Sequence, residues 1–142
     1  MRSSGVDAGP GSSGSSPRRR LREGGEGSYE DVAGYSRAIR VGSRISVSGT
    51  TAPALALSES TYDQTVGSLQ RAIGAVEELG GTRDSIVRTR VFLAPGADWQ
   101  AASAAHRKLL GDVAPANTML YVGTLIGPGL LVEVEVDAEV LG

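Results

Sequence analysis

The most constraining feature of this chain lies near its end, where residues 132–137 read VEVEVD. Three valines alternate with three acidic residues at a period of two, the period at which side chains leave opposite faces of a β-strand. Such a strand has one apolar face against a core and one acidic face toward solvent. Residues 130–140 (LLVEVEVDAEV) therefore predict a long strand that is buried on one face.

Three further segments have strand character. Residues 37–49 (RAIRVGSRISVSG) alternate on both sides of Gly42-Ser43, and glycine at the first central position favours a two-residue type II′ hairpin. Residues 86–94 (IVRTRVFLA) place Val87, Thr89, Val91 and Leu93 on one face, and Pro95-Gly96 ends the strand. Residues 117–123 (NTMLYVG) form the next strand, joined to the last one by a loop containing Gly127-Pro128-Gly129.

Two segments have helical spacing. Thr61 and Gln64 have the spacing of a capping box, and Gly80-Gly81 ends the helix that follows. Asp98 caps a second helix that runs to Leu110 and stops at Gly111. The first helix carries one apolar stripe at i, i+4, i+7, i+11 and i+14: Tyr62, Val66, Leu69, Ile73 and Val76.

The elements follow in the order β-β-α-β-α-β-β, and residues 53–57 are a candidate short strand. This order predicts an α/β (α+β) domain, with two helices on one face of a mixed sheet. Val and Leu also fall on the other face of the strands, so we expect it to be buried as well. Copies of the same chain are the simplest cover, and an oligomer is therefore expected.

Residues 1–28 differ from the rest of the chain. They contain seven serines and seven glycines, with almost no apolar side chain to offset the entropy of ordering. We interpret them as a flexible Ser/Gly/Arg-rich tail, followed by one folded domain over residues 29–142. The cluster Arg18-Arg19-Arg20 is then a solvated part of that tail, and no apolar stretch follows it as in a secretory signal.

Composition excludes several classes of function. The chain has no cysteine and a single histidine, His106, so that thiol chemistry is excluded and a protein-only metal site is not expected. No apolar run reaches the length of a membrane span, and a cytoplasmic location without a membrane partner is expected. Residues 29–142 carry nine basic and 13 acidic side chains, a net charge of −4 that disfavours nucleic acid as a partner.

Three stretches together carry a resemblance to a known family. They are GYSRAIRVGSRISVSGTTA (34–52), SIVRTRVFLAPGADWQAASAAHRKLLGD (85–112) and PANTMLYVGTLIGPGLLVEVEVDA (115–138). In order and spacing they resemble the RidA/YjgF (Rid) family of enamine/imine deaminases. The resemblance implies a chorismate-mutase-like fold and a homotrimer with a central barrel and clefts between subunits. It also implies hydrolysis of reactive enamines and imines such as 2-aminoacrylate, without any cofactor.

The resemblance also implies site residues. The cleft tyrosine of the family matches Tyr35, and the glycine whose backbone faces the substrate matches Gly49. The acidic residue that organises the attacking water matches Glu133, which is the candidate catalytic residue. On periodicity alone, Glu135 and Asp137 are ordinary residues of an acidic strand face.

Three further family positions are candidate substrate-binding residues, and two of them depart from the family. Ser103 stands where a polar amide is frequent, and Met119 stands where a cysteine is frequent. Asn117 replaces the arginine that pairs with the substrate carboxylate. Charge-assisted hydrogen bonds contribute about 1.5–3 kcal/mol each, so this divergent member lacking the arginine is expected to bind 2-imino acids poorly.

Two alternatives to a deaminase of altered specificity stay open. The chain could form a non-hydrolytic trimeric protein that binds a small ligand or a partner. It could also be a biosynthetic enzyme that steers a reactive intermediate. A general base at His106 is conceivable, but a surface or interface role is favoured for a lone histidine among alanines.

Overall fold

The computed structural model of the protein describes residues 4–8, 18–53 and 60–142. Its strands form one mixed sheet in the order β1-β2-β3-β4-β7-β5-β6, in which β5 and β6 are parallel and the other neighbours antiparallel. The elements are β1 (Ser4–Ala8), β2 (Arg18–Glu23), α1 (Tyr29–Ala33), β3 (Ala38–Val41), β4 (Arg44–Thr50), α2 (Thr61–Glu78), a 3₁₀ turn η2 (Arg83–Ser85), β5 (Ile86–Leu93), α3 (Trp99–Leu110), β6 (Ala116–Tyr121) and β7 (Val132–Glu139).

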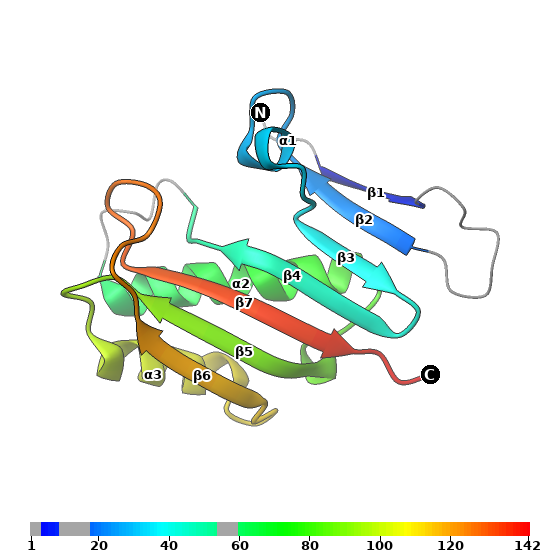
Figure 1. Ribbon diagram of the computed structural model, residues 1–142. Helices are drawn as coiled ribbons and strands as arrows, with labels where there is room; N and C mark the ends of the chain where they lie inside the picture. The colour runs from blue at the N-terminus through cyan, green and yellow to red at the C-terminus, as the bar shows by residue number, and fades with distance from the viewer. Residues whose placement is uncertain (1–3, 9–17, 54–59) are drawn as a thin grey trace.

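The sheet has one covered and one open face. Figure 1 shows α2 and α3 side by side on the same face of the sheet, with β7 in the middle. Val132, Val134 and Val136 of β7 are at most 1% exposed against this helical layer. The acidic residues between them lie on the open face. The predicted α+β class, with two helices on one face, is confirmed.

The open face carries both charged and apolar side chains. Alternation in register places charged and polar side chains there, and Arg90 of β5 lies 3.4 Å from Glu135 and 3.3 Å from Asp137 of β7. Alternation puts four large apolar side chains on this face as well: Ile39, Val41, Phe92 and Leu120. Val41 and Leu120 are 40% and 41% exposed there, so the expected burial of this face by another copy of the chain stays a prediction.

Several predicted elements are confirmed. The hairpin β3–β4 turns at Gly42, whose φ is +60°, while Ser43 has no positive φ, as a type II′ turn requires. Asp98 caps α3 by accepting from the N–H groups of Gln100 and Ala101. Residues 51–53 belong to no strand, and most of the candidate strand over residues 53–57 lies outside the described residues.

The cap and the buried face of α2 differ from the prediction. The N-cap is Ser60, whose Oγ accepts from the N–H of Asp63 at 3.2 Å. Gln64 is fully buried instead of capping, and its amide bonds the carbonyl of Gly129 and the N–H of Leu131, both at 2.9 Å. The buried face of α2 is largely small and polar, and from the predicted apolar stripe it includes Leu69 and Val76. The buried residues are Thr61, Gln64, Thr65, Ser68, Leu69, Ala72, Ala75 and Val76.

Two irregularities change which side chains are buried. In β5 the pairing with β7 shifts between Ile86 and Arg88, so Val87 is 49% exposed, against the prediction that it shares the buried face. In β4 the pairing with β7 shifts between Val47 and Thr50, and Ser48 and Gly49 form the irregularity. A β-bulge of this kind redirects side chains locally.

The interpretation of residues 1–28 as a flexible tail is wrong for those that the structure describes. Strand β2 pairs with β3, and Leu21 is 1% exposed in the core. Strand β1 pairs in turn with β2. One apolar residue among arginines was enough to bring β2 into the sheet, because β3 offered a free edge for pairing. This pairing cannot be predicted from composition. The folded domain therefore begins before residue 29.

Candidate functional site

Three of the predicted site residues come together at one end of β4 and β7. Glu133 lies on the open face of β7, and its carboxylate occupies the space where a Cβ on Gly49 of β4 would stand. Tyr35, Gly49 and Glu133 line one pocket of about 290 Å³. Gly49 belongs to the bulge in β4, and its lack of a side chain leaves room for the carboxylate of Glu133.

Arg37 lies in the same pocket and was not among the predicted residues. It is 9% exposed, its Nη2 donates to the carbonyl of Gly49 at 2.6 Å, and its Cζ lies 6.0 Å from the centre of the Tyr35 ring. Its backbone N–H donates to the carbonyl of Leu21, and its carbonyl accepts from the N–H of Ser48. The signal available in the sequence was a lone arginine two residues after Tyr35.

Burial and charge act together on Glu133. The side chain is half-buried, and desolvation raises the pKa of its carboxyl above the ordinary value. The neighbouring charge of Glu135 raises the pKa further, whereas the guanidinium of Arg37 opposes the rise. A carboxyl with a raised pKa exchanges protons closer to neutral pH, as general acid–base chemistry requires.

A second pocket adjoins this one on the side of the N-terminal segment. It measures about 280 Å³ and shares Tyr29, Tyr35, Arg37 and Thr51 with the first. Arg71 of α2 closes it by donating to the carbonyl of Thr51 at 2.6 Å and pairing with Glu23 at 3.1 Å. Residues of β2 and α1 thus form part of the wall beside the candidate site.

The other three predicted residues form a separate group between β6 and α3. Ser103 Oγ lies 3.6 Å from Met119 Sδ, and both line pockets of about 360 and 370 Å³ together with Asn117. Asn117 donates through Nδ2 to Thr89 Oγ1 at 3.0 Å. These residues lie on the face of the sheet that carries the helices.

A short chain of hydrogen bonds fixes the side chain of Asn117. Thr89 Oγ1, which accepts from Asn117, also lies 2.7 Å from His106 Nε2. The hydroxyl of Thr89 thus joins the amide of Asn117 to the ring of His106, and the tautomer of His106 decides which of Thr89 and His106 donates. Burial lowers the pKa of His106, in agreement with a neutral ring. The amide oxygen of Asn117 is left facing away from Thr89.

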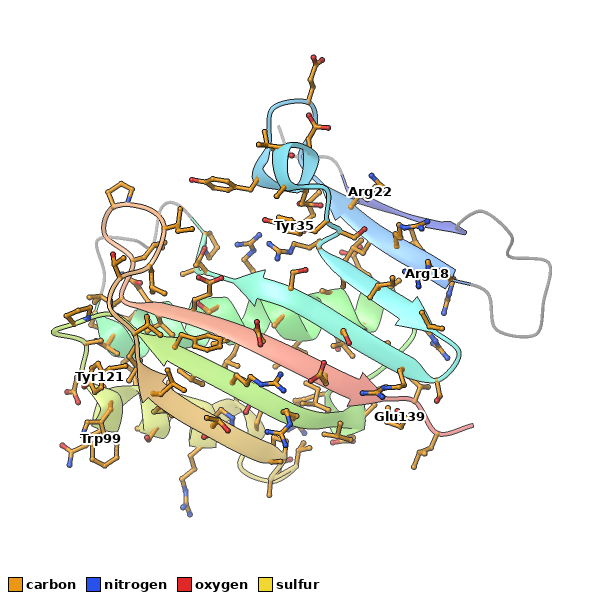
Figure 2. All side chains as sticks on the ribbon, in the orientation of Figure 1. Arg18, Arg22, Tyr35, Trp99, Tyr121 and Glu139 are labelled. Carbon is orange, nitrogen blue, oxygen red and sulfur yellow. The ribbon has the colours of Figure 1, made fainter. Side chains whose placement is uncertain are left out.

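The two groups do not meet within one chain. In the sheet, β7 and β5 separate β4 from β6. Figure 2 shows Tyr35, which belongs to the first group, beside α1 and β3, and Tyr121, which lines a pocket of the second group, on the edge strand β6. Within the described ranges, no cluster of three or more His, Cys, Asp or Glu residues could hold a metal ion. None of the helices described is long and apolar enough to cross a membrane.

The fold and the pocket lined by Tyr35, Gly49 and Glu133 define a small α+β protein of the kind seen in several solved structures. The model of the family Endoribonuclease L-PSP matches residues 27–140. The chain therefore belongs to this family, also called YjgF/YER057c/UK114, and the predicted resemblance is confirmed.

Individual relatives agree with this assignment. Rv2704 of Mycobacterium tuberculosis, a member of the YjgF/YER057c/UK114 family, is 35% identical, with a TM-score of 0.77 over 87% of this chain and 99% of that one. An uncharacterized protein of Streptomyces coelicolor is 37% identical over 84% of this chain and 90% of its own. PA3499 of Pseudomonas aeruginosa, at 21% identity, shares the fold with a TM-score of 0.73 over 97% of this chain and 94% of that one.

Proposed function

We propose that this protein is a homotrimeric hydrolase of reactive enamines and imines, with Glu133 as the residue that activates water. The observation that carries the proposal is the half-buried Glu133 carboxyl, whose pKa is raised and which lies over Gly49 in a pocket with Tyr35. The family resemblance supplies the reaction class, and the substrate needs no cofactor because its C=N carbon is already electrophilic.

The reaction consists of addition and elimination. Glu133 takes a proton from water as the water oxygen bonds to the C=N carbon, while the nitrogen gains a proton, which gives a carbinolamine. The carbon–nitrogen bond then breaks as the hydroxyl loses its proton, and a carbonyl compound and ammonia leave. An enamine first takes a proton on carbon to become the imine.

In this proposal a neighbouring subunit completes each site. Tyr35, Gly49 and Glu133 form one half, and Ser103, Asn117 and Met119 of a second copy form the other, because they lie apart in a single chain. A homotrimer with three such clefts is the arrangement that the family resemblance implies. Light scattering after size-exclusion chromatography tests it against the chain mass of 14.6 kDa.

Asn117 gives the proposed enzyme an altered specificity. Its Nδ2 is engaged by Thr89, so it presents an amide oxygen, which accepts from a substrate N–H and does not pair with a carboxylate. An amide in place of a guanidinium weakens binding of a carboxylate next to the reacting carbon by about 2–4 kcal/mol. Imines without that carboxylate are the expected substrates.

An ammonia-release assay on freshly generated imines tests the proposal. The wild type is compared with Glu133→Gln and with Glu135→Gln, its matched control on the same face of β7. Turnover of a carboxylate-free imine is expected to fall by about 10²–10⁴-fold in Glu133→Gln and to persist in Glu135→Gln. If the wild type hydrolyses neither kind of imine, the proposal is wrong, and a ligand-binding or intermediate-steering protein takes its place.

The name of the family model also raises a ribonuclease. The whole chain has a net charge of −2, which opposes binding of a phosphodiester backbone. In β2, Arg19 donates to the carbonyl of Leu79 at the end of α2 and is engaged within the fold. The pocket around Glu133 therefore supports imine chemistry better than RNA cleavage.

A further inference from the structure

Arg37 has more hydrogen-bonding capacity than the folded chain uses. A guanidinium offers five N–H donors, and burial of its charge is unfavourable unless the charge is paired. Arg37 is 9% exposed, and its hydrogen bond to Gly49 is neutral. Its Nε is buried without a partner. Within the described part of the chain, Arg37 forms no ion pair.

Two of the three carboxylates near Arg37 are engaged by other groups. In the pocket beside α1, Glu23 pairs with Arg71, and Glu30 Oε1 accepts from the backbone N–H of Glu23 at 3.1 Å. In the other pocket the carboxyl of Glu133 has a raised pKa despite Arg37. Among the described residues, no carboxylate is therefore in ion-pair contact with Arg37, although the charge of Arg37 acts on Glu133.

Arg37 also stands where the two pockets meet. It lines the pocket of Glu133 and the pocket bounded by β2 and α1. A ligand whose reacting carbon lies at Glu133 can therefore extend past Arg37 into the second pocket. A negative group on such a ligand would meet the free donors of Arg37 at a point removed from the reacting carbon.

We propose that Arg37 is the anion-binding residue of this cleft, and that it selects ligands whose carboxylate is separated from the C=N or C=O carbon. The subsite belongs to the same subunit as Glu133 and depends on β2, since Arg37 bonds to the backbone of Leu21. The identity of the reacting group, a C=N or C=O carbon, is taken from the proposed function. The anion subsite is inferred from Arg37 and does not depend on that function.

Three five-carbon ketones that resemble reaction products test the subsite by titration calorimetry. They are 4-oxopentanoate, with a distant carboxylate, 2-oxopentanoate, with an adjacent carboxylate, and neutral 2-pentanone. The wild type is expected to bind 4-oxopentanoate at least about tenfold more tightly than either of the others. Arg37→Gln is expected to abolish this preference, and Arg37→Lys to keep part of it, because lysine retains the charge but not the fork of donors.

Other results would overturn the inference. They are an unchanged preference in a folded Arg37→Gln variant, equal binding of 4-oxopentanoate and 2-pentanone by the wild type, and no binding of any of the three ketones. Circular dichroism and a denaturation curve establish that Arg37→Gln is folded.

The corresponding imines separate this inference from the proposed function. Hydrolysis that depends on Glu133 but is insensitive to Arg37→Gln for every imine would reject the anion subsite alone. Selective binding of 4-oxopentanoate that depends on Arg37, without hydrolysis of any imine, would reject the hydrolase alone.

Discussion

The carboxylate of Glu133 lies over the Cα of Gly49, so that a Cβ at position 49 would collide with Oε2 and stand 3.1 Å from Cδ. The two residues come from neighbouring strands, and the irregularity of β4 lies between Val47 and Thr50. The position of the candidate catalytic carboxylate therefore depends on the absence of a side chain at residue 49.

Gly49→Ala is expected to displace Glu133 and to reduce imine hydrolysis by about tenfold or more, because displacement of a catalytic group costs much of its contribution. The loss should lie mainly in kcat. Steady-state kinetics on a carboxylate-free imine measure it.

Gly74→Ala is the matched control for that variant. Gly74 lies inside α2, and a Cβ there would have no neighbour within 4 Å. Alanine in a helix is favoured over glycine by about 0.5–1 kcal/mol, so Gly74→Ala should raise the free energy of unfolding and leave activity unchanged. If both variants lost activity, the effect of Gly49→Ala could not be assigned to displacement of Glu133.

The pH profile should respond to the neighbours of Glu133 with opposite signs. Glu135 raises the pKa of Glu133 and Arg37 lowers it. Activity that needs the ionised base falls as pH drops through this pKa. Glu135→Gln should therefore move the acid limb of kcat/KM to lower pH, and Arg37→Gln should move it to higher pH. Identical acid limbs in all three proteins would contradict Glu133 as the base.

Stability should follow the same pKa. The folded pKa of Glu133 lies above the ordinary value of 4.5, so its favourable contribution is present below pH 4.5 and is lost as pH rises through the folded pKa. Compared with the wild type, the uncharged Glu133→Gln should thus gain stability between pH 4 and pH 7. Urea denaturation at the two pH values measures the difference.

Leu21→Ala tests whether the N-terminal segment belongs to the fold. Leu21 of β2 is 1% exposed, and its truncation should lower the free energy of unfolding by about 2–5 kcal/mol. Val6, which pairs with Leu21 across β1 and β2, is 42% exposed and provides the control, since Val6→Ala should cost little. Equal and small effects would mean that β2 adds nothing to the core.

Thr89→Val tests the support of Asn117. Thr89 is fully buried, and valine of similar shape would leave His106 Nε2 without its hydrogen-bond partner at a cost of about 1–3 kcal/mol. His106 is the single histidine, so its NMR signals are unambiguous. They should report a neutral ring, in agreement with the lowered pKa, and Thr89→Val should shift the ring nitrogen signals because Nε2 loses its partner. The exposed Thr118 of β6 supplies the control variant Thr118→Val.

Much of the fold was predictable because its signals are local. The Gly42 turn, the Asp98 cap and the alternation of β7 each depend on residues close together in the chain. Predictions failed where a distant partner decided the outcome. Gln64 was read as a cap, but the loop that ends at Leu131 binds its amide, which no local pattern reveals.

The candidate site divides in the same way. Tyr35, Gly49 and Glu133 were predicted from the family resemblance, because each matches a position in the stretches that carry it. Arg37 was not, since its importance comes from burial, from an unpartnered Nε and from contacts with Leu21 and Gly49. These are properties of packing between segments.

By itself, the sequence determined the family and the element order from β3 onward, since strand alternation, caps and motifs are encoded within short stretches. Tertiary structure alone decided that β2 joins the sheet, that Arg90 lies beside Glu135 on the open face, and that Arg37 is buried between two pockets. The physical reason is that hydrogen-bond partners, burial and bulges depend on which distant segments come together. A local sequence pattern specifies a helix or a strand, and the segments that pack against that element determine the burial and the hydrogen-bond partners of its side chains.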